Sequence, residues 1–184
     1  MFHQFSKTLY HGTPFEITKI DVTKGRNNKD FGKGFYMAVS KQQAIGMMHK
    51  KYSELQNRLQ NKKDIDSYSE RLYEINVDLE YIQTLKVKYF DKADLEWLNF
   101  ILMCREQGGT PHDYDVVIGP TADDNTLACL RTYWQGFYGK IGSEEAKEIL
   151  LKNLEPENLG RQYFIAKQEI VDKLIKSYKE INWR

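Results

Sequence analysis

The sequence predicts an α+β protein in which strands and helices are mixed around one core. Segments that alternate apolar and polar residues are interspersed with segments of helical spacing, and their order lacks the regular strand–helix repeat of a doubly wound sheet. The length of 184 residues suits one domain, and a hydrophobic content of 41% is enough to fill its core. We therefore expect residues 1–184 to form a single domain.

Alternating or continuously apolar segments predict six strands. They cover residues 7–11, 34–38, 71–77, 85–90, 114–119 and 161–166. Gly12 is expected to end the first strand, because glycine interrupts strand patterns. Residues 12–33 are expected to form a loop with a polar cluster from Lys24 to Asp30.

Apolar spacing and N-cap residues predict five helices. Ser40 begins a helix of about twenty residues, Asp91 begins a second, and Ser143 begins another with two glutamates in its first turn. A further helix is expected near residues 126–135. The chain is expected to end on a helix with the apolar stripe Ile170, Leu174, Ile175 and Tyr178.

Charge and cysteine content exclude several classes of protein. The 27 basic and 26 acidic residues give a net charge of +1, which supplies no global attraction for nucleic acid or an acidic membrane. Only Cys104 and Cys129 are present, which excludes a disulfide scaffold and a cysteine-rich zinc site. No apolar run reaches the roughly 18 residues of a membrane span, and the N-terminus lacks an apolar signal core. We expect a cytoplasmic protein without membrane contact.

Two N-terminal segments carry side chains that suit ligand chemistry. Leu9–Thr13 places His11 at a strand end beside a glycine, where a neutral imidazole can donate one hydrogen bond and accept another. A structural or surface histidine is the alternative. Asp30–Tyr36 sets two glycines among aromatic rings, which suits either a flat cationic ligand or a tight turn with core aromatics.

Two later segments, and one basic stretch, have similar alternatives. The carboxylates of Ile118–Asn125 suit a metal or acid–base chemistry, or simply N-capping of a helix by Asp124 or Asn125. Gln162 in the strand Gly160–Ala166 points into a cleft, where it needs partners, or lies on an edge strand. The stretch 41–63 is a nucleic-acid contact or a solvated helix face. Its basic residues are Lys41, Lys50, Lys51, Arg58, Lys62 and Lys63, against Glu54.

In order, these four segments resemble the motifs of the H-Y-E type of ADP-ribosyltransferases, the group that contains the poly(ADP-ribose) polymerases and diphtheria toxin. LYHGT is similar to the polymerase strand L-W-H-G-S, and FGKGFYMAVSKQQA is similar to F-G-K-G-I-Y-F-A-D-x-x-S-K-S-A. DVVIGPTAD and RQYFIA are similar to the later strands L-I-L-L-G-E-V-A and N-E-Y-I-V-Y. Small bacterial domains of unassigned activity share this layout. The resemblance implies a split antiparallel sheet with flanking helices and NAD+ in a cleft between its halves.

The resemblance also implies roles for individual residues. His11 would donate to the ribose of NAD+, and Gly12 would pair its backbone with the nicotinamide amide. Tyr36 would pack on the nicotinamide ring, because an aromatic face attracts a cationic ring. Gln162 would orient the ribose or the acceptor, so that His11, Tyr36 and Gln162 are the catalytic candidates.

Further residues are expected to bind NAD+, and no metal is expected. They are Thr13, Arg26, Lys33, Gly34, Phe35, Ala44 and Met47, in addition to His11, Gly12 and Tyr36. Arg26 and Lys33 would face the pyrophosphate, since basic side chains suit phosphate oxygens.

The chain departs from the polymerase pattern in three places. Gln162 replaces a glutamate, and an amide can hold a hydroxyl but carries no charge to stabilise a cationic sugar. Met47 stands near the position of a second stacking tyrosine, for which Tyr52 is a candidate substitute. Residues 48–113 form an insertion that adds strands and a helix, either for substrate recognition or as scaffold.

These implications lead to a mono-ADP-ribosyltransferase that releases nicotinamide and modifies a protein or nucleic-acid acceptor. One alternative is an NAD+ glycohydrolase, in which water is the acceptor. The other is a non-catalytic module that binds NAD+ or ADP-ribose, in which Gln162→Glu would create or raise activity. A toxin-like pairing with an inhibitor protein is also implied.

Overall fold

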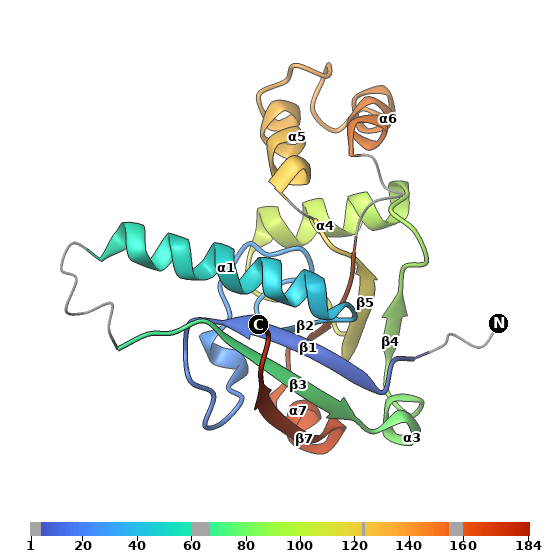
Figure 1. Ribbon diagram of the computed structural model, residues 1–184. Coiled ribbons are helices and arrows are strands. Elements are labelled where there is room, and N and C mark those ends of the chain that lie inside the picture. Colours follow the sequence, from blue (N-terminus) through green and yellow to red (C-terminus); the bar gives the residue numbers. More distant parts are fainter. Residues whose placement is uncertain (1–4, 60–66, 123, 155–159) are drawn as a thin grey trace.

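The computed structural model describes residues 5–59, 67–122, 124–154 and 160–184 (Figure 1). The side chains of Asp124, Asn125 and Leu127 lie outside this description. The seven described strands form one mixed sheet in the order β4-β5-β6-β2-β1-β3-β7, with helices between them in the chain. The expected α+β class is confirmed.

The sheet contains all six expected strands and one that was not expected. The strands are β1 (Thr8–Thr13), β2 (Phe35–Ala38), β3 (Arg71–Val77), β4 (Val87–Tyr89), β5 (Val116–Pro120), β6 (Arg161–Ile165) and β7 (Ile175–Ile181). Neighbours are antiparallel, except that β4 and β5 run parallel. Gly12 does not end β1, because it stays in register with Leu72 of β3. The insertion 48–113 therefore supplies β3 and β4 to the sheet itself.

The five expected helices appear in the expected order, with one shifted start. The helices are η1 (Val22–Lys24), α1 (Lys41–Arg58), α3 (Leu79–Ile82), α4 (Leu95–Gln107), α5 (Asp124–Trp134), α6 (Glu144–Asn153) and α7 (Gln168–Leu174), of which the short helices η1 and α3 were not expected. Ser40 and Ser143 cap α1 and α6 as expected, since each side chain accepts a backbone N–H three residues later. The expected cap Asp91 is wrong: Asp94 caps α4, because its side chain is the one that accepts the backbone N–H of Trp97.

The C-terminal segment corrects a further expectation. The last helix, α7, ends at Leu174, and the residues that were expected to continue it form the strand β7. β7 pairs with β3 from Ile175 opposite Val77 to Ile181 opposite Leu72. Apolar spacing over so short a stretch fits helix or strand, and the exposed edge of β3 decides between them by offering backbone hydrogen bonds.

Helices cover both faces of the sheet, as Figure 1 shows. On one face, α7 and α3 pack against strand residues such as Leu9, Met37 and Ile75. On the other face, α4 lies against β5 and β6, and α5 and α6 stack on α4 away from the sheet. α1 covers the neighbouring part of this second face, where Ala44 and Met48 pack against β1 to β3.

The sheet opens between β1 and β2. These neighbours share a single registered pair, Tyr10 opposite Ala38, whereas β1 and β3 share six. Beyond that pair, the imidazole of His11 bonds the backbone oxygen of Tyr36. In a regular ladder, a backbone N–H of the neighbouring strand would make this bond. The opening places one end of α1 and the ends of β5 and β6 around a gap in the ladder.

Candidate functional site

A small hollow lies at this opening and collects six of the expected site residues. His11, Gly12, Tyr36, Ala44, Met47 and Gln162 line it. The remaining lining residues are Tyr10, Met37, Ala38, Gln43, Lys51 and Thr121. Its volume is about 60 Å³. The structure thus brings together residues from the segments that resemble L-W-H-G-S, F-G-K-G-I-Y-F-A and N-E-Y-I-V-Y, and Thr121 adds the segment Ile118–Asn125.

His11 is held as a neutral ring with a defined tautomer. Its Nδ1 lies 2.6 Å from the carbonyl oxygen of Tyr36, and its ring stacks on Phe35 at a centroid distance of 4.7 Å. Because a carbonyl only accepts, Nδ1 carries the hydrogen and Nε2 is left as an acceptor. Burial, with a smaller contribution from Lys51, lowers the His11 pKa to about 3. A ligand hydroxyl would donate to Nε2, which reverses the donor role that the resemblance implies.

Gly12 is required by helix packing. A Cβ atom at this position would lie 2.0 Å from the carbonyl oxygen of Ala44 and 2.7 Å from Cβ of Met48. The backbone of α1 therefore comes as close to β1 as the missing side chain permits. This close approach explains the glycine without any ligand.

Lys51 belongs to the hollow, which the sequence analysis missed. Its Nζ donates to the carbonyl oxygen of Gly12 at 2.7 Å. Burial, followed by the positive charges of Lys29 and Arg26, lowers the Lys51 pKa to about 8. The signal was available, because Lys51 is seven residues after Ala44 and so shares the helix face that meets β1.

Tyr36 presents its ring and ties up its hydroxyl. The hydroxyl donates to the carbonyl oxygen of Gly32 at 2.7 Å and accepts from the backbone N–H of Phe31 at 3.1 Å. Burial, and after it the charge of Asp30, raises the Tyr36 pKa well above its usual value. The ring packs at 4.9 Å from that of Phe164. Tyr36 is therefore a neutral aromatic wall whose hydroxyl closes the preceding turn.

Gln162 is buried beside a charge that the sequence analysis did not assign to the site. Its Nε2 donates to Oδ2 of Asp30 at 2.9 Å, and the carbonyl oxygen of Pro120 lies 3.5 Å away. Asp30 is 6% exposed and forms an ion pair with Arg105 of α4. No local pattern could join residues 30, 105 and 162, because only the fold makes them neighbours. The edge-strand alternative for Gln162 is wrong, since β6 lies between β5 and β2.

Five expected binding residues do not line the hollow. Thr13 is buried and accepts from the N–H of Phe15 at 3.2 Å, and the ring of Phe35 lies in the core beneath His11. Gly34 packs against β6. The backbone of Lys33 bonds to the turn that follows α4. The fifth, Arg26, is exposed and lies 3.4 Å from Glu54.

Positive charge gathers at one side of the hollow. Burial lowers the pKa of Lys29, the carboxylate of Asp30 opposes this effect, and the cations Arg105 and Arg26 add to it. Arg26 and Lys29 likewise lower the pKa of Lys51, while Glu54 opposes them. Together with Arg105, these three cations outnumber the carboxylates of Asp30 and Glu54, so the surface attracts anions. We call Arg26, Lys29 and Lys51 the basic cluster.

Lysines of the basic stretch 41–63 make contacts within the protein. Nζ of Lys41 bonds a backbone oxygen near the C-terminus at 3.3 Å, and Nζ of Lys51 bonds one in β1 at 2.7 Å. Lys62 and Lys63 lie outside the described residues. Two ammonium groups of this stretch are therefore held by backbone oxygens of the protein itself.

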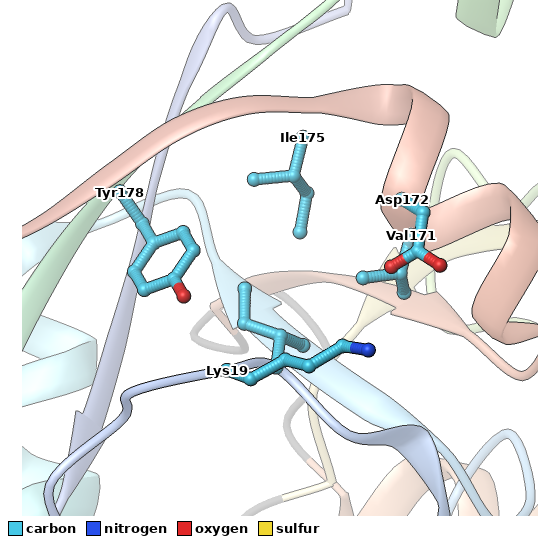
Figure 2. A pocket seen from close by; sticks show the side chains of 6 residues that line it. Lys19, Val171, Asp172, Ile175 and Tyr178 are labelled. Atoms are coloured by element: carbon cyan, nitrogen blue, oxygen red, sulfur yellow. The ribbon is translucent and has the colours of Figure 1, made fainter.

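A larger hollow of about 220 Å³ lies elsewhere and contains none of the expected residues (Figure 2). Lys19, Ile20, Val171, Asp172, Ile175 and Tyr178 line it. The hydroxyl of Tyr178 donates to the carbonyl oxygen of Thr18, and Asp172 accepts from Gln168. The first contact joins β7 to the loop before η1 and the second lies within α7, so both polar groups already have structural partners, and the chemistry favours the smaller hollow.

The structure bears on the metal and membrane expectations only for the residues that it describes. Among these residues, no three His, Cys, Asp or Glu side chains converge on a point where a metal could bind. Asp123 lies outside the described residues, as do the side chains of Asp124 and Asn125, so the paired-carboxylate motif is not described. None of the helices in the described ranges combines the length and apolar character needed to cross a membrane.

Fold and hollow together define an α+β protein whose mixed sheet opens at one strand pair, with histidine, tyrosine and glutamine around the opening. Residues 7–176 match the family described as "Protein of unknown function (DUF3990)", and the chain belongs to this family. No curated protein and no solved structure matched the chain.

Proposed function

We propose that this member of the DUF3990 family is an NAD+-dependent mono-ADP-ribosyltransferase with a split sheet of the ADP-ribosyltransferase type. The observation that carries the proposal is the bond of 2.6 Å between Nδ1 of His11 and the carbonyl oxygen of Tyr36, at the opening where Gln162 lines the same hollow. Three residues from three separate motifs of the resemblance meet at one place. Had they pointed into separate regions, the proposal would have no support.

In this proposal the side chains divide the work of cleaving the bond between ribose and nicotinamide. The ring of Tyr36 packs against the cationic nicotinamide, and neutral Nε2 of His11 accepts from a ribose hydroxyl. As the bond breaks, its electron pair passes to nicotinamide and the sugar carbon becomes cationic. The acceptor attacks that carbon and loses a proton to water. Gln162, which lines the same hollow, would turn its amide oxygen to the developing charge as a fixed dipole.

The hollow is smaller than the proposed ligand requires. Pockets for small molecules usually hold about 300–1,000 Å³, whereas this hollow holds about 60 Å³. Lys51 occupies the backbone oxygen of Gly12, the group expected to pair with nicotinamide. We expect Lys51, which lines the hollow, to move away from that oxygen when the ligand binds.

The basic cluster suits the remainder of the ligand. NAD+ carries two phosphates, and Arg26, Lys29 and Lys51 lie close enough to influence one another. A guanidinium holds phosphate oxygens in a planar fork, so Arg26 remains the proposed pyrophosphate contact and Lys29 joins it. Lys33 stays a weaker candidate, because its backbone is tied to the turn after α4.

The decisive experiment measures nicotinamide release and transfer of labelled ADP-ribose from NAD+ to cell extract. Wild type should yield both, and His11→Ala should lower both by about a hundredfold, within the usual range for a group that acts in the transition state. His49→Ala is the matched control, because His49 is an exposed histidine paired with Glu70. No release and no labelled product across protein and nucleic-acid acceptors would overturn the proposal. Release without label would indicate the glycohydrolase instead.

A binding module without turnover is the second candidate, and the charge of the hollow favours it. Gln162 supplies no carboxylate, and the ammonium of Lys51 repels a cationic ring while attracting phosphates. Such a protein would bind ADP-ribose more tightly than NAD+. Calorimetry with both ligands distinguishes the candidates, since a transferase binds NAD+ at least as well and turns it over.

A further inference from the structure

The buried carboxylate of Asp30 lies beneath the hollow and has a full set of partners. Its Oδ1 accepts from Nε of Arg105 at 3.1 Å, and a second guanidinium nitrogen completes the ion pair. Its Oδ2 accepts from the N–H of Ala122 at 3.1 Å and from Nε2 of Gln162 at 2.9 Å. Every contact is a hydrogen-bond donor, as an ionised carboxylate requires when it is taken out of water.

These contacts fix which way the Gln162 amide faces. Oδ2 of Asp30 and the carbonyl oxygen of Pro120 are both acceptors, so the atom beside them must be the amide nitrogen. The amide oxygen therefore faces away from Asp30, and Gln162 is among the residues that line the hollow. A carboxylate at the nitrogen end also polarises the amide, which makes its oxygen a stronger acceptor.

We propose that Asp30 is a positioning residue for this hollow. It directs the amide oxygen of Gln162 into the hollow, and its carboxylate, which lies in the loop before β2 and is paired with Arg105, polarises that amide. This inference rests on the proposed transferase function. It assigns the role to Asp30 and Gln162 acting together, and not to Gln162 alone.

The contact between Asp30 and Gln162 reverses the expectation that Gln162→Glu would create or raise activity. Gln162→Glu would place a second carboxylate about where Nε2 now stands, 2.9 Å from Asp30. Two carboxylates at that distance repel and share one proton. The variant should lose activity and stability instead of gaining activity.

The test must separate the charge of Asp30 from its place in the fold. Asp30→Asn leaves the buried Arg105 without its ion-pair partner and is expected to be unstable. The double variant Asp30→Asn/Arg105→Met removes both charges and keeps an acceptor oxygen for Gln162. As a matched control, Asp115→Asn/Lys167→Met removes an ion pair of 2.6 Å whose residues do not line the hollow.

Two readouts are taken on each folded variant. In nicotinamide release from NAD+, Asp30→Asn/Arg105→Met should lower kcat on the order of tenfold with KM changed little, and the control should match wild type. Gln162→Glu should also lower kcat. In nitrogen-15 NMR, the side-chain amide of Gln162 should exchange slowly in wild type and shift or exchange faster in the double variant.

The outcomes are distinct. An active wild type whose double variant keeps full kcat, or a Gln162→Glu variant that is more active than wild type, overturns the role of Asp30 and leaves the transferase intact. A wild type that neither binds nor cleaves NAD+ overturns the proposed function. In that case the amide signal decides by itself whether Asp30 fixes Gln162. If the double variant fails to fold, Gln162→Glu decides the matter.

Discussion

At the residue scale, burial of an imidazole between two strands sets how this protein responds to acid. The His11 pKa is about 3 in the folded state, against roughly 6.5 in an unfolded chain. Between these values the unfolded chain binds the extra proton, so stability rises with pH over this window and is lost as pH falls from about 6.5 towards 3. The neutral ring that the proposed chemistry needs is thus maintained at pH 7.

We therefore expect His11→Asn to flatten the dependence of stability on pH. Asparagine can still donate to the carbonyl oxygen of Tyr36 but cannot be protonated. Urea unfolding at pH 7 and pH 4 should show that wild type loses on the order of 3 kcal/mol more than the variant. His49→Asn, the same substitution at an exposed histidine, is the matched control. Parallel curves for wild type and His11→Asn would contradict the assignment.

The ammonium of Lys51 leads to a second prediction at this scale. Because its Nζ occupies the Gly12 oxygen, Lys51→Met should bind nicotinamide itself about tenfold more tightly, as a competing charged donor is removed. Raising the pH from 7 to 9 should bring wild type towards the variant, because Lys51 loses its proton near pH 8. Titration by NMR measures both affinities. Arg58→Met, on an exposed part of α1, should behave as wild type.

At the scale of elements, the site depends on how closely α1 meets β1. Ala44, Met47 and Lys51 reach the hollow from the same helix, and Gly12 is the residue that lets the helix approach. The insertion contributes at this scale too, because Arg105 near the end of α4 holds Asp30 and the turn after α4 bonds Lys33. The insertion thus supports the loop that carries Asp30, and it also brings Lys51 to the hollow.

Two glycine-to-alanine variants test this packing. Gly12→Ala should lower the free energy of unfolding by about 2–3 kcal/mol, because the new methyl group meets the backbone of α1. Gly46→Ala should raise it by up to about 1 kcal/mol, because that position within α1 faces open space. Thermal unfolding measures both changes. Equal effects of the two substitutions would rule out the close approach as the reason for Gly12.

At the scale of the whole molecule, one sheet unites all of these elements. β7 covers β3, and β3 in turn pairs with β1 along six residues and so supports the strand that carries His11. The edge of β1 that faces the opening is therefore supported by β3 and β7 on the opposite edge of β1. Stability of the site and stability of the sheet are linked through β3.

Removing the last strand tests this link. A chain that ends at Leu174 lacks β7 and exposes the edge of β3, which invites pairing with other chains. We expect a lower Tm and concentration-dependent aggregation, seen by calorimetry and light scattering. A monomeric truncated protein with the wild-type Tm would show that β7 adds nothing to the sheet.

The sequence by itself determined the local features of this protein. Ser40 and Ser143 cap helices because a side-chain oxygen reaches an N–H three residues away, and six strands follow from patterns only a few residues long. The resemblance of four segments also located six residues of the hollow. These features depend on neighbours along the chain, which a sequence displays directly.

Only the tertiary structure decided the rest. Whether Ile175–Ile181 continues a helix or forms β7 depends on a strand edge about a hundred residues earlier in the chain, at Arg71–Val77. Asp30 and Gln162 meet although 132 positions separate them, and Lys51 reaches Gly12 across 39. Such contacts form where backbone edges and buried charges must find partners, and that requirement acts through space and not along the chain.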